Sequence, residues 1–502
     1  MNSLSKNPAE LTITTVIGLE VHVQLKTESK LFCGCLNRFG GEPNTQVCPV
    51  CLGLPGALPV INQSALELSV KAGLAMDCEI PETTKWDRKQ YFYPDLPKGY
   101  QISQFDMPIC AEGYIDIETG GDDDAESESR RLRILRAHLE EDAGKSMHDE
   151  SSGGGDTLVD LNRCGTPLLE IVSQPDMRNS EEAIAYLQEL KSRMTHLNIS
   201  DCEMQEGSLR VDANVNLHIT DGDRNVATPI VEVKNMNSFR SVRLAIDYEV
   251  DRQWEVWQQT GQTIDDVSKT TRGWDDNRET TFLQREKEES ADYRYFPDPD
   301  LLPVQIDPSR VDEIRDSIEE LPRQATERLQ NQYGIKTADA ELIVSGGSEM
   351  VRYFETAANR SGDAKRTVSI VNQDVLRTMK ERSIEIESFP INASKLGDLI
   401  SRIAGGELDN SRGRDVFNYL VEHDQSVESA IKALGIESVD AGQTESLCRE
   451  LLGENPTVVE DYRAGKKQAI GALIGKARGK NPNANPQQVR ETLIRLIESG
   501  EV

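Results

Sequence analysis

Four segments of the chain alternate apolar and polar side chains with a period of two, which is typical of strands with one buried face. They are residues 17–26, 131–142, 209–218 and 231–234. In the first of them, Glu20 and His22 fall on the polar face. Together the segments predict a largely antiparallel sheet with one face on a core and the other densely charged. Such a face suits the floor of a metal-nucleotide site, although a solvated outer face is the simpler interpretation of any single strand.

Helical spacing of apolar residues follows Ser180, which we expect to be the N-cap of a helix, and a second helix is predicted over residues 240–259. Two stretches rich in Gly, Ser and acid, 120–129 and 146–157, are predicted to be exposed loops. After Pro303 the strand signal disappears and helices remain. The sequence therefore predicts the α+β class, with domains at residues 1–303, 304–355 and 356–502.

The composition describes a multidomain protein without membrane spans. The chain has 502 residues and a formal net charge of -30, and a charge of that size should repel nucleic acid at long range. No run approaches the roughly 20 apolar residues of a membrane span, and the N-terminal stretch is polar. We therefore expect a cytoplasmic protein with no membrane and no DNA partner, in which any RNA contact uses a local basic patch.

Four of the nine cysteines are clustered as a C-x-C and a C-x-x-C pair, Cys33 with Cys35 and Cys48 with Cys51. Four thiolates at such spacings suit tetrahedral zinc in a closed, structural site. The single residue between the first pair makes this spacing less typical than two C-x-x-C pairs, so ordinary free thiols remain the alternative. The other five cysteines stand alone, and we expect them to be packing residues.

Carboxylates at the ends of the predicted strands are candidates for a magnesium site. Glu20 and His22 lie two apart on one strand face, and Glu140 with Glu141 ends another strand. Magnesium takes oxygen ligands and can bridge nucleotide phosphates. A surface-exposed polar pair is the alternative interpretation of Glu20 and His22.

Phosphoryl chemistry also needs cations that balance charge on the transferred oxygens. The candidates are Lys89, Arg163, Lys234, Arg240 and Arg294, and for each one a surface ion pair is the alternative. The sequence contains no complete phosphate-binding loop, no dinucleotide fingerprint and no G-x-S-x-G nucleophile turn. We also find no nucleophile of the kind that hydrolyses glutamine.

The C-terminal region reverses the acidic character of the chain. Six cations occur with no acid between the first and the last: Arg463, Lys466, Lys467, Lys476, Arg478 and Lys480. Such a patch can neutralise RNA phosphates in a salt-dependent manner. A solvated cationic helix face is the alternative.

Read together, seven segments closely resemble the B-subunit family of tRNA-dependent amidotransferases. They are residues 16–25 (VIGLEVHVQL), 48–59 (CPVCLGLPGALP), 91–104 (YFYPDLPKGYQISQ), 138–145 (HLEEDAGK), 160–170 (DLNRCGTPLLE), 231–240 (VEVKNMNSFR) and 292–297 (DYRYFP). They follow one another in order over nearly the whole of the first 300 residues. The acidic, Gly-rich insertions around Asp122 and Gly153 look longer than the family needs.

The resemblance implies a cradle-shaped catalytic domain related to glutamine synthetase, then a helical domain and an all-α tail that binds tRNA. It implies that ATP phosphorylates the side-chain carboxylate of misacylated Glu-tRNA(Gln) or Asp-tRNA(Asn), and that ammonia then displaces the phosphate. Ammonia would come from a separate amidase, the A subunit, that hydrolyses glutamine, and a small C subunit would complete a heterotrimer.

By the same resemblance, magnesium or the activation site would involve Glu20, His22, Glu140, Glu141 and Glu206. Contacts to nucleotide or carboxylate would come from Lys89, Arg163, Lys234 and Arg240. Two alternatives stay open: a non-catalytic tRNA-binding scaffold, and a stand-alone amide ligase that acts on a small molecule without tRNA. The choice between Asn and Gln tRNA depends on which synthetases misacylate, so the sequence leaves it open.

Overall fold

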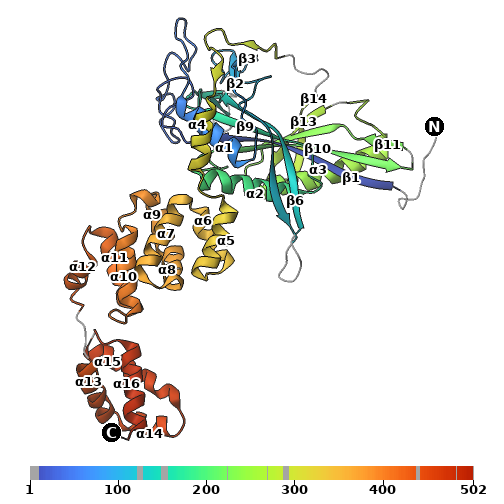
Figure 1. Ribbon diagram of the computed structural model, residues 1–502. Helices are drawn as coiled ribbons and strands as arrows, with labels where there is room; N and C mark the ends of the chain where they lie inside the picture. Colours follow the sequence, from blue (N-terminus) through green and yellow to red (C-terminus); the bar gives the residue numbers. More distant parts are fainter. Residues whose placement is uncertain are drawn as a thin grey trace. The chain divides into compact units, whose positions relative to one another are not determined.

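The computed structural model describes residues 11–120, 128–148, 157–222, 224–267, 269–286, 293–436, 441–481 and 483–500 (Figure 1). The chain divides into two compact units, Met1–Pro322 and Arg323–Val502. The first combines a large sheet with helices, and the described part of the second is helical. The predicted α+β class with a helical C-terminal region is thus confirmed. The three domains expected at residues 1–303, 304–355 and 356–502 stay a prediction beside this division.

The large sheet of the first unit has the strand order β14-β13-β12-β10-β1-β9-β6-β5, and β11 also pairs with β10. Its strands are β1 (Leu11–Gln24), β5 (Cys110–Thr119), β6 (Glu128–Glu141), β9 (Pro167–Ser173), β10 (Leu209–Asp221), β11 (Arg224–Ala227), β12 (Ile230–Lys234), β13 (Lys269–Asp275) and β14 (Thr280–Glu286). Apart from the parallel pair β12 and β13, the neighbouring strands are antiparallel. The four strands predicted from the sequence are β1, β6, β10 and β12.

One face of this sheet is covered by helices, because the apolar half of each alternating strand needs a partner. The alternating residues of β1, from Ile17 through Val23, are almost completely buried in the core of the unit. The helices of this unit are α1 (Gln63–Ala75), α2 (Ser180–His196), α3 (Phe239–Thr260) and α4 (Pro308–Ser317). In Figure 1, α2 and α3 run beneath the sheet, where α2 contacts β5 and α3 contacts β10. The polar half of each strand therefore faces away from α2 and α3.

Side-chain caps set the starts of the two longer helices. Asn179, rather than the predicted Ser180, caps α2, because its side chain accepts the N–H of Glu182 at 2.8 Å. The helix predicted over 240–259 is α3, which begins after the cap Ser238 and ends at the left-handed Gly261. The N-cap prediction was thus wrong by one residue, since Asn and Ser are comparable caps and the sequence holds both side by side.

The described part of the first unit also contains three small sheets. They are β3 (Asp87–Gln90) with β4 (Tyr100–Ser103) and β15 (Phe296–Pro297), β2 (Thr83–Thr84) with β16 (Val304–Gln305), and β7 (Lys145–His148) with β8 (Thr157–Asp160). The prediction of a loop over 146–157 was wrong at both ends, because residues 146–148 belong to β7 and residue 157 belongs to β8. The loop predicted over 120–129 was wrong at its end, where residues 128 and 129 belong to β6. Residues 121–127 and 149–156, including Asp122 and Gly153, lie outside the described residues.

The described part of the second unit is built from short helices around two apolar cores. They are α5 (Pro322–Tyr333), α6 (Thr337–Ser345), α7 (Ser348–Ser361), α8 (Ala364–Ile370), the π-helical turn Val371–Val375, α9 (Leu376–Arg382), α10 (Ala393–Ala404), α11 (Asn410–Glu422), α12 (Val427–Ala433), α13 (Ala441–Glu454), α14 (Pro456–Arg463), α15 (Ile470–Lys480) and α16 (Pro486–Glu498). The first core runs from Ala325 to Ala430 and the second from Cys448 to Ile497. Among the described helices of the chain, none is long and apolar enough to cross a membrane.

Two glycines in this unit make a matched pair for testing helix packing. A Cβ at Gly397 in α10 would lie 2.6 Å from Cβ of Arg360 and 2.9 Å from the backbone oxygen of Ala357, both in α7. Gly397→Ala should therefore lower the free energy of unfolding by on the order of 1–3 kcal/mol, as overpacking does.

Gly475→Ala in α15 is the control, because a Cβ there meets no atom within 4 Å. This change should stabilise its helix by about 0.5–1 kcal/mol. Urea unfolding followed by circular dichroism measures both variants. Equal effects of the two substitutions would contradict the close packing of α7 on α10.

Candidate active site

A row of polar side chains crosses four neighbouring strands on the face of the sheet opposite the apolar core. The row runs from His138 on β6 through Glu170 on β9 and His22 on β1 to Arg210 on β10. Each residue is the direct cross-strand neighbour of the next in the strand register. Cross-strand neighbours have Cβ atoms about 4.5–5.5 Å apart, so these side chains must interact.

Two carboxylates lie close to both histidines of this row. An oxygen of Glu170 lies 3.3 Å from Nε2 of His22 and 3.5 Å from Nε2 of His138. Glu140 approaches the same two nitrogens at 3.7 and 3.9 Å. Ligand atoms of His22, Glu140 and Glu170 all lie within 4.8 Å of one another, a spacing that fits a single cation.

Burial and charge act in opposite directions on these histidines. For His22, burial lowers the pKa, but the hydrogen bond to Glu170 and the charges of Glu170 and Glu140 outweigh burial and raise the pKa to about 9. For His138, burial dominates and its pKa falls below the ordinary value. At neutral pH His22 therefore carries a proton, which a bound cation would have to displace.

A pocket of about 430 Å³ opens over this row. Its lining residues are His22, Lys89, Tyr91, Gln101, Glu140, Asp142, Ala143, Arg163, Arg210, Val211, Asp212, Lys234, Asn235, Met236 and Asn237. They come from the polar face of the sheet, from β3 and β4, and from the segments that follow β6, β8 and β12. The pocket thus brings three acids together with four Lys and Arg side chains.

Two of these four cations are held by neighbouring groups. Arg163 donates to the backbone oxygens of Ala143 at 3.1 Å and Gly144 at 2.7 Å, and it pairs with Asp142 at 3.2 Å. Lys234 pairs with Asp212, and it lies 3.7 Å from Glu232. Arg163 and Lys234 therefore shape the pocket wall.

The other two cations are the ones best placed to meet a ligand. Within the described residues Arg210 has one ion pair, to Asp142 at 3.1 Å, and Lys89 has none. The Lys89 ammonium lies over the rings of Tyr293, at 5.0 Å, and Tyr91, at 5.8 Å. Burial lowers the pKa of Lys89, but surrounding acids led by Glu140 raise it above its usual value. Lys89 is thus a half-buried, charged ammonium with donors to spare.

The structure brings only some of the predicted site residues into this pocket. His22, Glu140, Lys89, Arg163 and Lys234 line it. The lining does not include the other five, Glu20, Glu141, Glu206, Arg240 and Arg294.

Glu20 accepts a hydrogen bond from Asn214 at 2.9 Å and is absent from the pocket lining. Glu141 points to the other side of β6, where it binds Lys98 and the N–H of Ile102. Glu206 lies in an exposed turn, and Arg240 is an exposed residue of α3 that pairs with Glu279 at 2.8 Å.

Several residues of the pocket and its row were not predicted, and for four of them the sequence carries a signal. His138 and Asp142 keep the period of two with Glu140, so they share its face. Arg210 falls on the polar face of its alternating strand, and Glu170 is an acid inside an otherwise apolar strand. What the sequence lacks is the register, which is set by pairing between strands far apart in the chain.

The four clustered cysteines do meet. Their sulfur atoms lie within 4.8 Å of one another, and all four are free thiols. The pKa of Cys51 is lowered to about 5, and the largest cause is its hydrogen bond with Cys33. The positive charge of the nearby Lys30 also lowers this pKa. Nζ of Lys30 lies 3.9 Å from Sγ of Cys51. The remaining five cysteines are buried, in agreement with a packing role.

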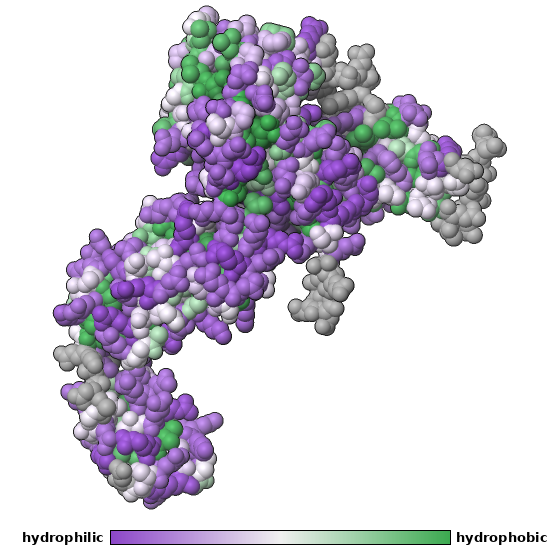
Figure 2. Space-filling model, in the orientation of Figure 1, coloured by the Kyte–Doolittle hydropathy of each residue, from purple (hydrophilic) through white to green (hydrophobic). Residues whose placement is uncertain are grey.

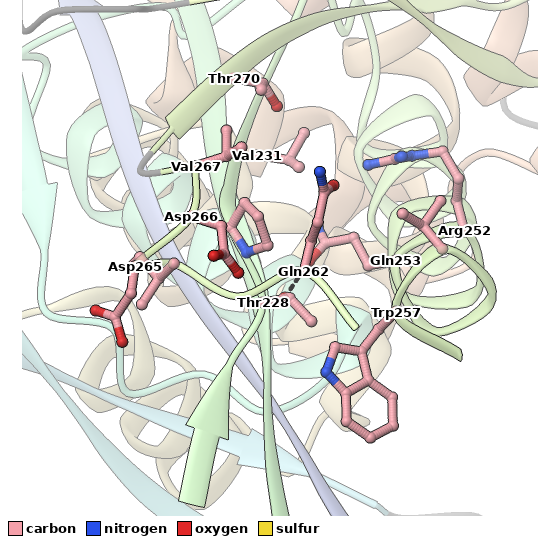
Figure 3. Close-up of a pocket in the computed structure, with 13 residues that line it drawn as sticks. Thr228, Val231, Arg252, Gln253, Trp257, Gln262, Asp265, Asp266, Val267 and Thr270 are labelled. Atoms are coloured by element: carbon pink, nitrogen blue, oxygen red, sulfur yellow. Dashed lines mark hydrogen bonds between the residues drawn. The ribbon is translucent and has the colours of Figure 1, made fainter. Parts of the chain in front are cut away.

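A larger pocket, of about 660 Å³, lies between α3 and the segment around β12 and β13. In Figure 3, Arg252, Gln253 and Trp257 project from α3 toward it, and Asp265 and Asp266 come from the loop that follows. Its inner polar groups bind one another: Thr228 donates to Gln253 at 2.7 Å, and Arg252 pairs with the fully buried Glu249 at 2.7 Å. The arginine in the lining of this pocket, Arg252, is therefore already paired, whereas the smaller pocket contains the less occupied cations Lys89 and Arg210.

The basic residues of the C-terminal region are all exposed, but several are already paired. Lys480 binds Glu450 and Glu454 at 2.8 and 2.6 Å, and Lys466 binds Asp461 at 3.0 Å. Lys476 donates to the side chain of Asn455 at 2.6 Å. Arg463 is exposed on α14. Lys467 and Arg478 have no acid partner within the described residues, and they are the cations best able to meet an external anion.

Known proteins resemble the chain over both units. Two family models match it: the GatB/GatE catalytic domain over residues 15–312 and the GatB domain over residues 352–497. The B subunit of the aspartyl/glutamyl-tRNA(Asn/Gln) amidotransferase from Rhodopirellula baltica is 67% identical over 485 residues, which is 97% of each chain. The protein of the same name from Chlorobaculum tepidum is 45% identical over 96% of this chain and 99% of its own. That from Thermoanaerobacter sp. is 43% identical over 95% and 98%.

The buried acid beside the pocket, Glu232, gives a pH test of the charged sheet face. Burial raises its pKa, but Lys234, Lys269 and a hydrogen bond from Thr271 outweigh burial and lower the pKa to about 2. A lowered pKa stabilises the fold above the unfolded value of 4.5, and this contribution is lost as the pH falls toward 2.

Glu232→Gln should therefore reduce the free energy of unfolding by about 1–3 kcal/mol at pH 7, and the difference from wild type should shrink below pH 4.5. Urea unfolding at pH 7, 5.5 and 3.5 measures it. A pH-independent difference would show that altered packing, rather than charge, is responsible.

Proposed function

Since this chain belongs to the GatB/GatE family of amidotransferase B subunits, we propose that it carries out the amide-forming step of a tRNA-dependent amidotransferase. The substrates would be Glu-tRNA(Gln), Asp-tRNA(Asn) or both, and the product is the Gln or Asn form. The observation that carries the proposal is the pocket in which His22, Glu140 and Glu170 meet beside Lys89 and Arg210. A cytoplasmic location is part of this proposal.

The reaction needs activation because a carboxylate is a poor acyl donor at neutral pH. In the proposed first step, the side-chain carboxylate of the Glu or Asp attached to the tRNA attacks the γ-phosphorus of ATP. The products of this step are an acyl phosphate on that amino acid and ADP. In the second step, ammonia attacks the acyl carbon, phosphate leaves with the bonding electrons, and the nitrogen loses a proton. Both steps move negative charge across phosphate oxygens, which cations must balance.

Both kinds of positive charge that this chemistry requires, a bound metal ion and protein cations, would be held in this pocket. His22, Glu140 and Glu170 offer one nitrogen and two carboxylates within 4.8 Å, and these would hold magnesium. When bound, magnesium neutralises phosphate oxygens and orients them. Lys89 and Arg210 would bind the γ-phosphate and the substrate carboxylate, and their burial strengthens each interaction relative to water.

Partner subunits complete the proposed enzyme. The sequence has no nucleophile of the kind that hydrolyses glutamine, so an amidase, the A subunit, would supply ammonia through a protected channel, and a small C subunit would complete the heterotrimer. The cysteine cluster would hold structural zinc, since its four sulfurs already lie at the spacing of a tetrahedral site. The basic face of the C-terminal helices would bind tRNA phosphates.

Glu140→Gln tests the proposal directly. In the complex reconstituted with its amidase partner, and with ammonium in place of glutamine, this change should reduce ATP-dependent amidation of misacylated tRNA by on the order of 100-fold or more. Binding of tRNA should be retained, because the proposed tRNA contacts are other residues, the basic side chains of the C-terminal region.

Glu112→Gln is the matched control, an exposed glutamate of β5 outside the pocket lining. Undiminished amidation by Glu140→Gln would favour the alternative that this chain is a non-catalytic scaffold. Amidation of a small carboxylic acid without tRNA would favour a stand-alone ligase.

Binding of tRNA is tested by removing Lys467 and Arg478, two cations of the basic patch that have no acid partner within the described residues. The double change to Ala should weaken tRNA binding and flatten its salt dependence by about 0.7–0.9 in log–log slope for each phosphate that is no longer neutralised. Filter binding at several salt concentrations measures both effects. The control is Lys432→Ala, which removes an exposed lysine of α12. An unchanged slope in the double variant would show that tRNA binds elsewhere.

A further inference from the structure

The loop that carries the cysteine cluster packs directly on the side chain of Lys98. Gly53, two residues after Cys51, has a φ of +67°, and a Cβ there would lie 2.3 Å from Cγ of Lys98. The turn is fixed by its own backbone, because the N–H of Leu52 donates to the carbonyl of Cys48 at 3.1 Å. Any shift of the cysteine loop is therefore transmitted to Lys98.

Lys98 in turn holds the end of strand β6. Its ammonium pairs with Glu141, and the two side chains are only 8% and 3% exposed. Glu141 also accepts the N–H of Ile102 at 2.9 Å, which ties β6 to β4. A buried ion pair of this kind fixes geometry strongly, since removing one partner leaves an uncompensated charge.

A second connection runs through the backbone. A Cβ at Gly165 would lie 3.4 Å from Cβ of Cys51. The N–H of Gly165 donates to the carbonyl of Asp142 at 2.9 Å, and its own carbonyl accepts the N–H of Leu31 at 2.8 Å. The cysteine loop is thus linked, through Gly165, to Asp142, the residue that follows Glu141.

Alternation along the strand makes these contacts matter to the pocket. Glu140 and Asp142 line the pocket, while Glu141 between them points the other way. Successive side chains of a strand leave on opposite faces, so the direction of Glu141 determines the direction of its two neighbours.

We propose that Lys98 is a positioning residue that couples the cysteine cluster to the cation-binding carboxylate Glu140, through its ion pair with Glu141. The inference rests on the proposed function, because it takes His22, Glu140 and Glu170 as the magnesium ligands. A metal in the cysteine cluster then acts on catalysis at a distance, by setting the affinity and geometry of a second metal site.

The test measures the affinity of the full-length protein for Mn²⁺ alone by electron paramagnetic resonance. The main variant is the double change Lys98→Met and Glu141→Gln, which removes both charges and so leaves no unpaired buried carboxylate. Its Mn²⁺ affinity should fall about 10- to 100-fold, the usual cost of losing a group that orients a metal ligand. Its zinc content by elemental analysis, and its unfolding midpoint, should stay near wild type.

Two further variants separate positioning from general packing. Lys98→Arg should keep the ion pair with Glu141, so its Mn²⁺ affinity should stay close to that of the wild type. Lys191→Met is the matched control, because it removes a lysine that pairs with Glu203 at 3.0 Å and takes no part in the pocket. It should bind Mn²⁺ as wild type does.

Removing metal from the cysteine cluster with a chelator completes the test. It should lower Mn²⁺ affinity in wild type but add little in the double variant, where the connection is already broken. Wild-type Mn²⁺ affinity in the double variant would overturn the role of Lys98 and leave the proposed function intact. Absence of Mn²⁺ binding by the wild type would overturn both.

Discussion

The alternation of side chains along β1, β6, β9 and β10 is the constraint on which the pocket depends. The apolar half of each strand is buried against the helices, so a slip of one residue would expose that half and bury the charges. The hydrophobic core therefore fixes the register, and the register sets His138, Glu170, His22 and Arg210 side by side. Packing on the opposite face of the sheet therefore keeps these four polar side chains next to one another.

The polar face of the sheet is held in a fixed arrangement because some of its cations are bound by neighbouring groups. Arg163 and Lys234 are bound by backbone oxygens or acids, which fixes the walls, while Lys89 and Arg210 keep donors available. Hydrophobic residues are also exposed near the pocket and the cysteine loop, among them Phe92 and Val60. Figure 2 shows hydrophobic residues gathered over the part of the first unit that carries the cysteine loop, β2 and β3, on a surface that is otherwise largely hydrophilic.

Local patterns were enough to predict four strands of the large sheet, the α+β class and the meeting of the cysteines, because period and spacing are properties of neighbouring residues. They were not enough to choose among acids. Glu20 and His22 share one face of one strand, yet only His22 reaches the pocket, since Asn214 on the paired strand binds Glu20. Glu140 and Glu141 look equivalent in the sequence but leave β6 on opposite sides. Glu170, which completes the cation site, is reached only through strand pairing 148 residues along the chain from His22.

The uneven charge of the chain also bears on how a polyanion approaches it. A net charge of -30 repels nucleic acid at long range, whereas the exposed Lys467 and Arg478, which have no acid partner in the described part of the chain, can attract a phosphate at short range. Encounters are therefore filtered by orientation before any specific contact forms, and the filter is weakest at high ionic strength, where the repulsion is screened along with the attraction. If these residues form the RNA contact proposed above, the charge distribution would favour nucleic acids that approach with a phosphate directed at this patch and disfavour the others.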